Sequence, residues 1–253
     1  MPIEKRWVVK PQGDPATVAM LATELGISPV LANLLVQRGI ETVEKANKFF
    51  KPDLSDLHDP FLMKDMDRAV ERVEQAVKRG EKIMIYGDYD VDGCTAVALV
   101  YKFLRQIGHK NLTFYIPDRY TEGYGISVRG IDVAARKGVS LIIALDCGIK
   151  ATEKVLYAKT KGVDFIICDH HLPAEEIPQA VAVLDPKRVD CNYPFDELSG
   201  GGVGFKLVQA YAQKNGIPFS QILDLLDLLV VSIASDIVPL SDENRILAYF
   251  GLK

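Results

Sequence analysis

The sequence predicts an α/β fold, a parallel sheet flanked by helices, with a small helical N-terminal extension and a helical C-terminal end. Short apolar strands alternate with helical segments between residues 82 and 184. These strands are apolar throughout, as expected where helices cover both faces of a parallel sheet. Further segments with helical spacing of apolar residues come before and after this alternation.

The N-terminal extension is predicted to span residues 1–60, and residues 61–253 form the main domain. Ser28 and Pro29 favour a helix start, because Ser caps free backbone N–H groups and Pro fits the first turn. That helix and a second short one precede the polar stretch 51–60, which contains two prolines. We interpret this stretch as a linker.

The elements of the main domain follow in a regular order, opened by an amphipathic helix from Met63 to Gly80. Strands are expected at 82–87, 112–116, 140–145, 164–168 and 180–184, with helices at 95–107, 127–137 and 151–161 between them. Two C-terminal helices are expected at 202–216 and 220–235, before another helical start. Because strands joined through helices form βαβ units, the sheet should be parallel.

Composition limits the class of protein. The net charge of -4 argues against a surface coated in positive charge, although a local basic groove could still bind nucleic acid. The four cysteines form no CxxC pair, so zinc-finger and thioredoxin-type sites have no support. The N-terminus lacks an apolar signal core, and no apolar run reaches about 18 residues. We therefore expect a soluble, cytoplasmic protein without membrane contact.

Acidic residues gather where predicted strands end. They are Asp88, Asp90 and Asp92 after the first strand, Asp146 after the third, and Asp169 with His170 and His171 after the fourth. The carboxyl ends of parallel strands lie along one edge of the sheet, where ligands bind. Carboxylates at short range repel one another, and a divalent cation removes this repulsion. We therefore predict a divalent-metal site at this edge.

Each strand end also has a plainer interpretation, since Asp often bonds its own backbone in turns. The paired histidines are harder to explain in this way, because the chain has only four histidines. The other two, His58 and His109, are interpreted as surface residues. Imidazole beside carboxylates favours Mn²⁺, and bridging carboxylates could hold two ions about 4 Å apart. Such a pair can activate water for in-line displacement at phosphorus.

Two other patterns leave alternatives open. The stretch DVDG after a strand resembles the first motif of haloacid-dehalogenase-type phosphatases, whose nucleophile would here be Asp90. Cys94 stands where that family usually has Thr or Val, and paired histidines have no role there. The stretch SGGGVGF is either a tight entry into a helix or a set of backbone N–H groups facing a phosphate.

The motifs DYDVDG, LDCGI, CDHHLP and SDIVPL, in this order, resemble the four motifs of the DHH phosphoesterase superfamily. The segments PDRYTEGYGIS and DCNYPFDELSGGGVGF are similar to its RecJ branch, bacterial 5′→3′ exonucleases specific for single-stranded DNA. Other branches have His where this chain has Tyr86, and Asp88 is the substitute typical of the RecJ branch. The resemblance covers most of residues 82–247 and also the helical residues before them.

The resemblance implies a role for each matching residue. The implied metal ligands are Asp90, Asp92, Asp146, His170 and Asp236, with Asp88 as a further candidate. Asp236 rests on the resemblance alone, because an Asp after an apolar helix is usually an end cap. His171 is implied to act with them and to contact the scissile phosphate, while Asp88 and Asp169 should support or bridge ligands.

The resemblance also implies a site for the 5′-phosphate at Arg119 and Tyr124. Arg can bind phosphate bidentately, and Tyr can bond a phosphate oxygen or stack on a base. A plain turn with a surface Arg is the other interpretation of this segment. The implied cofactor is two Mn²⁺ or Mg²⁺ ions, and the implied reaction is phosphodiester hydrolysis that releases 5′-mononucleotides in DNA repair and recombination.

One departure limits this expectation. RecJ proteins continue into a DHHA1-type substrate-binding domain and an OB-like domain, neither of which this sequence contains. We therefore expect an N-terminal fragment that binds Mn²⁺ and cuts DNA weakly, with single-stranded DNA, a single-strand-binding protein and a helicase as partners. Two alternatives stay open beside the phosphatase. One is a DHH enzyme acting on oligonucleotides or pAp, and the other is a non-catalytic binding protein.

Overall fold

The computed structural model describes residues 6–253 and contains two compact units, Met1–Asp53 and Leu54–Lys253. The boundary falls earlier than the predicted one after residue 60. The reason is that part of the expected linker folds as two 3₁₀ turns, Leu54–Asp56 and Pro60–Leu62, within the larger unit. Phe61 of the second turn packs against the core of that unit.

The smaller unit contains three helices, α1 (Pro15–Leu25), α2 (Pro29–Val36) and α3 (Val43–Phe50). Each begins at a side chain that accepts a hydrogen bond from a free backbone N–H, as expected for helix caps. The capping residues are Asp14, Ser28 and Thr42. The predicted helix start at Ser28–Pro29 is therefore confirmed.

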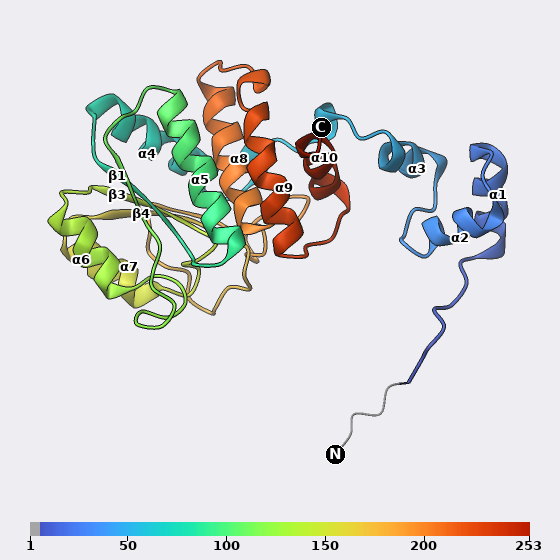
Figure 1. Ribbon diagram of the computed structural model, residues 1–253, viewed down its shortest axis with the longest axis horizontal. Coiled ribbons are helices and arrows are strands. Elements are labelled where there is room, and N and C mark those ends of the chain that lie inside the picture. Colours follow the sequence, from blue (N-terminus) through green and yellow to red (C-terminus); the bar gives the residue numbers. More distant parts are fainter. Residues whose placement is uncertain (1–5) are drawn as a thin grey trace. The chain divides into compact units, whose positions relative to one another are not determined.

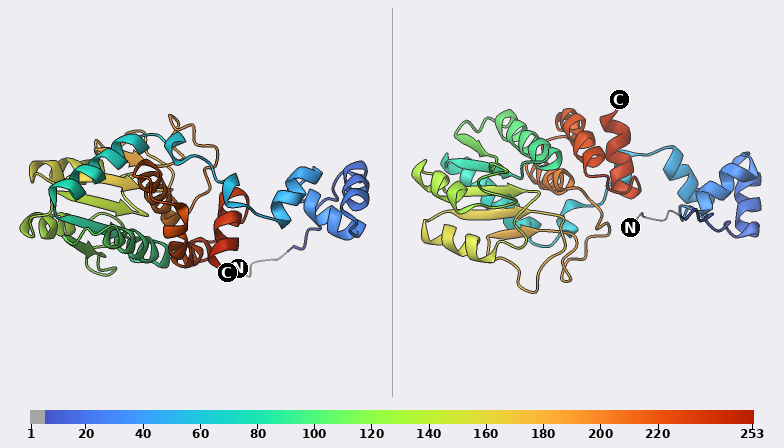
Figure 2. Two further views of the ribbon diagram at one scale, coloured as in Figure 1. Left: turned by 90° about the horizontal axis from the view of Figure 1, so that it is seen from above. Right: turned by 60° about the horizontal axis from the view of Figure 1, so that its bottom comes forward.

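The larger unit is built on a five-stranded parallel sheet with strand order β2-β1-β3-β4-β5 (Figure 1). The strands are β1 (Ile83–Gly87), β2 (Leu112–Tyr115), β3 (Leu141–Leu145), β4 (Asp164–Cys168) and β5 (Ala182–Leu184). All five were predicted, and the α/β class is confirmed. Figure 2 shows that the strands point the same way, so their carboxyl ends form a single edge.

The helices of the larger unit cover both faces of the sheet. They are α4 (Met66–Arg79), α5 (Val91–Gln106), α6 (Val128–Arg136), α7 (Thr152–Thr160), α8 (Gly200–Lys214), α9 (Leu226–Ser235) and α10 (Asp242–Gly251). In Figure 1, α4, α5 and α8 lie on one face, and α6 and α7 lie on the other. Within residues 6–253, no helix is long and apolar enough to cross a membrane.

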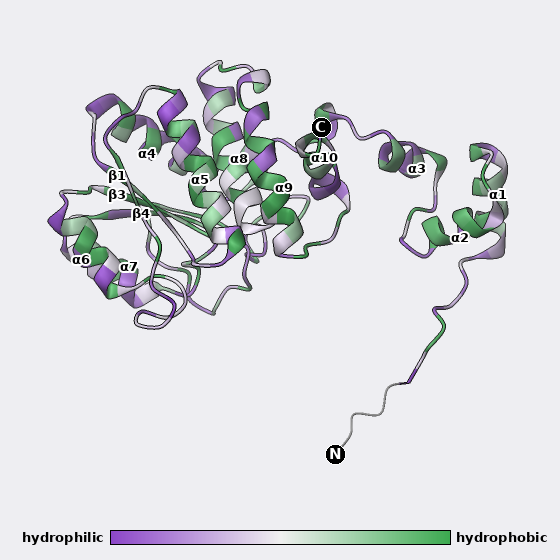
Figure 3. Cartoon of the chain, viewed as in Figure 1, coloured by the Kyte–Doolittle hydropathy of each residue, from purple (hydrophilic) through white to green (hydrophobic). Residues whose placement is uncertain are grey.

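Side chains of the central strands alternate between two cores, one on each face. Ile83 and Ile85 of β1 join the core under α4, α5 and α8, while Met84 and Tyr86 join the core under α6 and α7. Every residue of β1 and β3 is buried, which explains their unbroken apolar runs. Figure 3 shows the same pattern, with mainly green strands between helices that carry purple outer faces.

Three details differ from the sequence predictions. Helix α5 begins at Val91 rather than near residue 95, because the Asp90 side chain accepts a hydrogen bond from Gly93 N at 2.9 Å and caps it. The expected helix 220–235 starts with two 3₁₀ turns, and only its last ten residues form α9. His109 is 5% exposed, so its assignment to the surface was wrong. Gly108, at φ 88°, turns the chain back so that His109 N bonds Leu104 O.

Candidate metal centre

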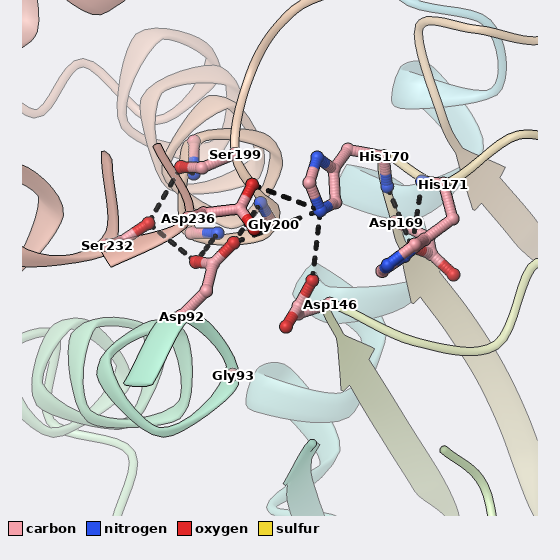
Figure 4. A network of polar contacts seen from close by, with 12 residues as sticks. Asp92, Gly93, Asp146, Asp169, His170, His171, Ser199, Gly200, Ser232 and Asp236 are labelled. Carbon is pink, nitrogen blue, oxygen red and sulfur yellow. Dashed lines mark hydrogen bonds and ion pairs between the residues drawn. The ribbon is translucent and has the colours of Figure 1, made fainter. Parts of the chain in front are cut away.

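The carboxyl edge of the sheet brings together most of the predicted site residues. Asp88 and the start of α5 follow β1, Asp146 follows β3, and Asp169–His171 follow β4. Asp236 reaches the same edge from the end of α9. Figure 4 shows the carboxylates of Asp92, Asp146 and Asp236 gathered at the Nε2 end of the His170 ring.

Asp92 lies in the first turn of α5 and is 2% exposed. Its carboxylate accepts hydrogen bonds from Gly200 N at 2.7 Å, Gly201 N at 2.8 Å and Ser232 Oγ at 2.6 Å. Burial raises the pKa of Asp92, and these donors act in the opposite direction. Three donors from α8 and α9 thus fix the carboxylate in one orientation (Figure 4).

The glycines of SGGGVGF allow this close approach. A methyl group at Gly200 would lie 2.6 Å from Asp146 Oδ1, and one at Gly201 would collide with Ser232 Oγ. The interpretation of the stretch as a tight helix entry is confirmed, because α8 begins at Gly200. The first two N–H groups of α8 bond the Asp92 carboxylate, so this side chain takes the place of the phosphate in the other interpretation of the stretch.

His170 is the common point of the site. Its Nε2 lies 3.2 Å from Asp146 Oδ1, 3.6 Å from Asp236 Oδ2 and 4.0 Å from Asp92 Oδ2. The ring is buried, and within residues 6–253 neither of its nitrogens has a hydrogen-bond partner. Buried polar atoms normally have a partner, so this arrangement fits a divalent cation that accepts the free Nε2 lone pair.

Two overlapping sets of potential ligand atoms, each within 4.8 Å of one another, share this imidazole. One set is Asp92, His170 and Asp236, and the other is Asp146, His170 and His171. Asp90 joins neither set, and its Oδ1 accepts the bond from Gly93 N that caps α5. Its predicted role as a metal ligand stays a prediction.

Asp146 occupies an unusual position at the end of β3. Its backbone lies in the left-handed region, at φ 59°, and its N–H donates to Cys168 O at 2.9 Å. Burial raises the pKa of the Asp146 carboxyl to about 10, with further contributions from Asp92 and Asp90. A carboxyl in these surroundings needs a positive neighbour to stay ionised, which is what a cation would supply.

Asp169 is bonded to protein donors at both oxygens. Its Oδ1 accepts from the backbone N–H groups of His170 and His171, and Oδ2 accepts from Ile149 N. The His171 ring adds a bond from Nδ1 at 2.7 Å. Burial alone would raise the pKa of Asp169, but the bonds from His171 hold it below its ordinary value. Asp169 therefore orients His171, as expected for a carboxylate that supports a functional histidine.

His171 and Tyr124 form the open side of the site. The side chain of His171 is 43% exposed, and the bond to Asp169 raises the pKa of its imidazole. Tyr124 Oη lies 3.1 Å from His171 Nε2 and donates to Asp146 O at 3.2 Å. The hydroxyl of Tyr124 thus joins the strand end after β3 to the exposed histidine.

Asp88 connects the carboxyl edge of the sheet to the loop that carries Arg119 and Tyr124. It is fully buried, and its Oδ1 accepts a hydrogen bond from Gly125 N at 3.0 Å. Tyr86 holds the same loop, donating to Gly125 O at 2.9 Å. Arg119 lies farther along the loop, with its guanidinium carbon 5.2 Å from the centre of the Tyr89 ring.

Several residues of the site were missed by the sequence analysis. Gly200, Gly201 and Ser232 were not assigned to Asp92, because nothing in their spacing indicates that contact. Ser199, which bonds Ser232 Oγ at 2.7 Å, was missed for the same reason. Asp185, directly after β5, is fully buried with one oxygen unpartnered among residues 6–253, and burial raises its pKa to about 7. A signal for Asp185 existed, since it is another carboxylate at a strand end.

Comparison with known proteins agrees with this geometry. A profile described as the DHH family, N-terminal domain, matches residues 82–233. The chain belongs to the DHH family. This membership leaves the phosphatase alternative without support, because that alternative gave no role to the paired histidines of the DHH motif.

Among DHH proteins, the single-stranded-DNA-specific exonuclease RecJ of Bacillus subtilis is 43% identical over 248 residues. The match covers 98% of this chain and 30% of the length of that relative. The crystal structure of RecJ with Mn²⁺ from Thermus thermophilus superposes with a TM-score of 0.78 at 26% identity, over 96% of this chain and 34% of that one. Another, of exonuclease RecJ bound to manganese, gives a TM-score of 0.70 at 30% identity, over 79% of this chain and 49% of that one.

Proposed function

We propose that this chain is the metal-binding, catalytic part of a 5′→3′ exonuclease specific for single-stranded DNA, which releases 5′-mononucleotides. The observation that carries the proposal is the convergence of three carboxylates on the free Nε2 of His170. The names of similar proteins support the substrate, and the two similar structures with manganese support the metal. We propose Mn²⁺ or Mg²⁺ as cofactor, probed first with Mn²⁺ because of the imidazole ligand.

In the proposed centre, two ions would be held by side chains that lie at the ends of strands and helices. These ligands are Asp90, Asp92, Asp146, His170 and Asp236, with Asp88 as a further candidate. Bound ions would supply an activated water and neutralise charge on the phosphate. Gly200, Gly201 and Ser232 keep Asp92 oriented, so one of these ligands is positioned before any ion binds.

His171 is proposed to contact the scissile phosphate. Asp169 holds the Nδ1 side of its ring, and the Nε2 side, which contacts the Tyr124 hydroxyl at 3.1 Å, faces the open side of the site, where a phosphate oxygen would replace that contact. A ring fixed in this way can donate an N–H to a phosphate oxygen as negative charge develops. Arg119 and Tyr124 are proposed to hold the 5′-phosphate, and stacking in a narrow passage would select single strands.

The proposed setting is the bacterial cytoplasm, in DNA repair and recombination. All four cysteines are free thiols, which agrees with a reducing compartment. A single-strand-binding protein and a helicase are the proposed partners, because both act on DNA that exposes single strands.

Cleavage of a length series of 5′-labelled single strands with Mn²⁺ tests the proposal. We expect Mn²⁺-dependent release of mononucleotides from the 5′ end. The rate of this release should fall more than about 100-fold in His170→Ala and in Asp92→Asn. Glu71→Gln, an exposed change on α4, serves as the control with unchanged activity. Cleavage confined to dinucleotides or pAp would replace the proposal with a small-substrate enzyme. Mn²⁺ binding without any cleavage would indicate a binding protein.

A further inference from the structure

Tyr89 lies within the acidic motif, between Asp88 and Asp90, but its phenol is not a candidate metal ligand. Its ring is half-buried and contacts two residues of the neighbouring loop. The guanidinium carbon of Arg119 lies 5.2 Å from its centre, and the Tyr124 ring meets it edge-on at 6.2 Å and 88°. Tyr89 is therefore placed between Arg119 and the open side of the metal centre.

The contacts continue from Tyr124 to the site itself. The rings of Tyr124 and His171 meet at 5.8 Å and 79°, and the Tyr124 hydroxyl lies 3.1 Å from His171 Nε2. Arg119, Tyr89, Tyr124 and His171 thus form one continuous row, which we call the aromatic row. Arg119 is at one end of this row, and the proposed scissile phosphate is at the other.

The backbone that carries Arg119 is well fixed. Asp118 Oδ1 accepts from the N–H groups of Tyr120 and Thr121, and Glu122 accepts from Tyr115 Oη, Ser127 Oγ and Asp118 N. The bond from Gly125 N to Asp88 ties the loop to β1. These bonds fix the position of the Arg119 Cα relative to the carboxyl edge of the sheet.

The Arg119 side chain itself is held differently. It is exposed, and among residues 6–253 its guanidinium has no ion-pair partner. The face of the Tyr89 ring is the contact that restrains it, through a cation–π interaction that leaves the N–H groups at the guanidinium edge available. A long side chain restrained before binding loses less conformational freedom when it binds an anion.

We propose that Tyr89 is a positioning residue that holds the Arg119 guanidinium for the phosphate at the 5′ end of the strand, and so sets the preference for phosphorylated over hydroxyl 5′ ends. The inference rests on the proposed function of the metal centre. It extends that function by assigning the discrimination between 5′-phosphate and 5′-hydroxyl ends to the ring of Tyr89. A ring that only filled space would affect both kinds of end equally.

Binding of two single-stranded oligothymidylates with phosphorothioate linkages to residues 1–253 in Mn²⁺ tests this. One carries a 5′-phosphate and the other a 5′-hydroxyl, and fluorescence anisotropy gives the ratio of their dissociation constants. In Tyr89→Leu we expect this ratio to shift about 3- to 10-fold toward unity, as loss of one cation–π contact implies. Arg119→Ala should shift it at least as far.

Two variants serve as controls. Tyr89→Phe keeps the ring face and should keep the wild-type ratio. Tyr120→Leu alters a ring that is 92% exposed beside Arg119 and should also leave the ratio unchanged. Circular dichroism checks that every variant is folded, and Arg119→Ala tests the same contact from the other side if Tyr89→Leu does not fold.

The inference is overturned if Tyr89→Leu or Arg119→Ala keeps the wild-type ratio, or if Tyr89→Leu weakens both ligands equally. It is also overturned if the unaltered chain binds both ends alike while Mn²⁺ is bound. Calorimetric titration with Mn²⁺ separates this from a failure of the proposed function, because an unaltered chain that binds no Mn²⁺ would contradict the metal centre itself.

Discussion

Two aspartates of the proposed metal centre, Asp92 and Asp236, are held in contrasting ways. Asp92 is buried and accepts three hydrogen bonds, whereas the side chain of Asp236 is 30% exposed at the end of α9. The oriented carboxylate is preorganised, while the exposed one can move to adapt to an ion. At the scale of single residues, the site therefore combines one fixed acidic group with one adaptable group.

The residue after Asp236 carries backbone strain. Ile237 lies at φ 57°, where a β-branched side chain is strongly disfavoured, and its side chain is 86% exposed. We expect Ile237→Asn to raise the free energy of unfolding by about 1 kcal/mol, because Asn tolerates this conformation and little packing is lost. Urea unfolding followed by circular dichroism measures the change. Leu240→Asn, exposed and without positive φ, is the control, and equal effects of the two changes would contradict the role of strain.

At the scale of elements, the first turn of α8 is placed against two strand-end groups at once. Gly200 faces Asp146, while its N–H bonds Asp92. A helix start normally tolerates Ala better than Gly, so local propensity and tertiary packing oppose each other here. The close approach of α8 to Asp146, rather than helix propensity, therefore accounts for glycine at position 200.

Gly200→Ala is expected to lower both thermal stability and Mn²⁺ affinity, because its methyl group would displace the Asp146 carboxylate. We expect the affinity to fall about 10-fold or more, measured by calorimetric titration. Gly202→Ala in the same turn is the matched control, since its methyl group would come no closer than 3.3 Å to any atom and would not meet Asp146. An Ala at Gly200 with wild-type affinity would refute this account of the helix start.

A second contact between elements lies at the opposite end of the sheet. Arg72 of α4 donates to Glu81 Oε2 at 2.7 Å and to Asp164 Oδ2 at 2.8 Å, and Ser140 Oγ donates to Glu81 at 2.6 Å. Burial alone would raise the pKa of Glu81, but these donors hold it below its ordinary value of 4.5. The charged form of Glu81 therefore stabilises the folded state above that pH.

Glu81→Gln should lower the free energy of unfolding by about 1–2 kcal/mol at neutral pH. Because the folded-state pKa is depressed, this difference is present above 4.5 and is lost as pH falls through the lower folded value. Urea unfolding of both proteins at neutral pH and near pH 3 measures it. A difference that stays constant across this range would show that charge is not the cause.

At the scale of the whole molecule, the two units have separate cores. The smaller one packs around Leu21, Leu35 and Ala46, and the larger one has a core on each face of its sheet. All residues of the proposed metal centre belong to Leu54–Lys253. The larger unit should therefore carry the metal chemistry by itself.

A chain of residues 54–253 is expected to fold and to bind Mn²⁺ with an affinity within about 3-fold of that of the longer chain, since every proposed ligand is retained. Calorimetric titration compares the two chains, and circular dichroism verifies folding. His170→Ala in the shorter chain is the control for specific binding. A folded shorter chain with strongly weakened binding would mean that the first unit contributes to the centre.

The sequence predicted those parts of the fold and site that follow from local patterns. Apolar runs located the strands, and polar residues at their ends located Asp146 and His170, because parallel strands share an edge. Asp92 was found in the same way, but the donors that orient it come from residues more than a hundred positions away. Such contacts depend on tertiary packing, which no local pattern encodes.

Asp236 illustrates the same limit. Its position after an apolar helix indicates only an end cap, and its distance of 3.6 Å to His170 Nε2 arises from how α9 packs on α5 and α8. The resemblance to DHH motifs supplied what periodicity could not. Helix α5 began early for a related reason, because one Asp of the acidic motif serves as a cap as well as a candidate ligand.

The dispersal of the ligands along the chain has a consequence for synthesis. A ribosome releases the chain from the N-terminus, so Asp92, Asp146 and His170 emerge well before Asp236 and the serine that bonds Asp92. A nascent protein that has exposed only the sheet still lacks these groups from α9. The nuclease that we propose would thus complete its metal centre only once α9 has emerged, after the strands that carry most of its other ligands.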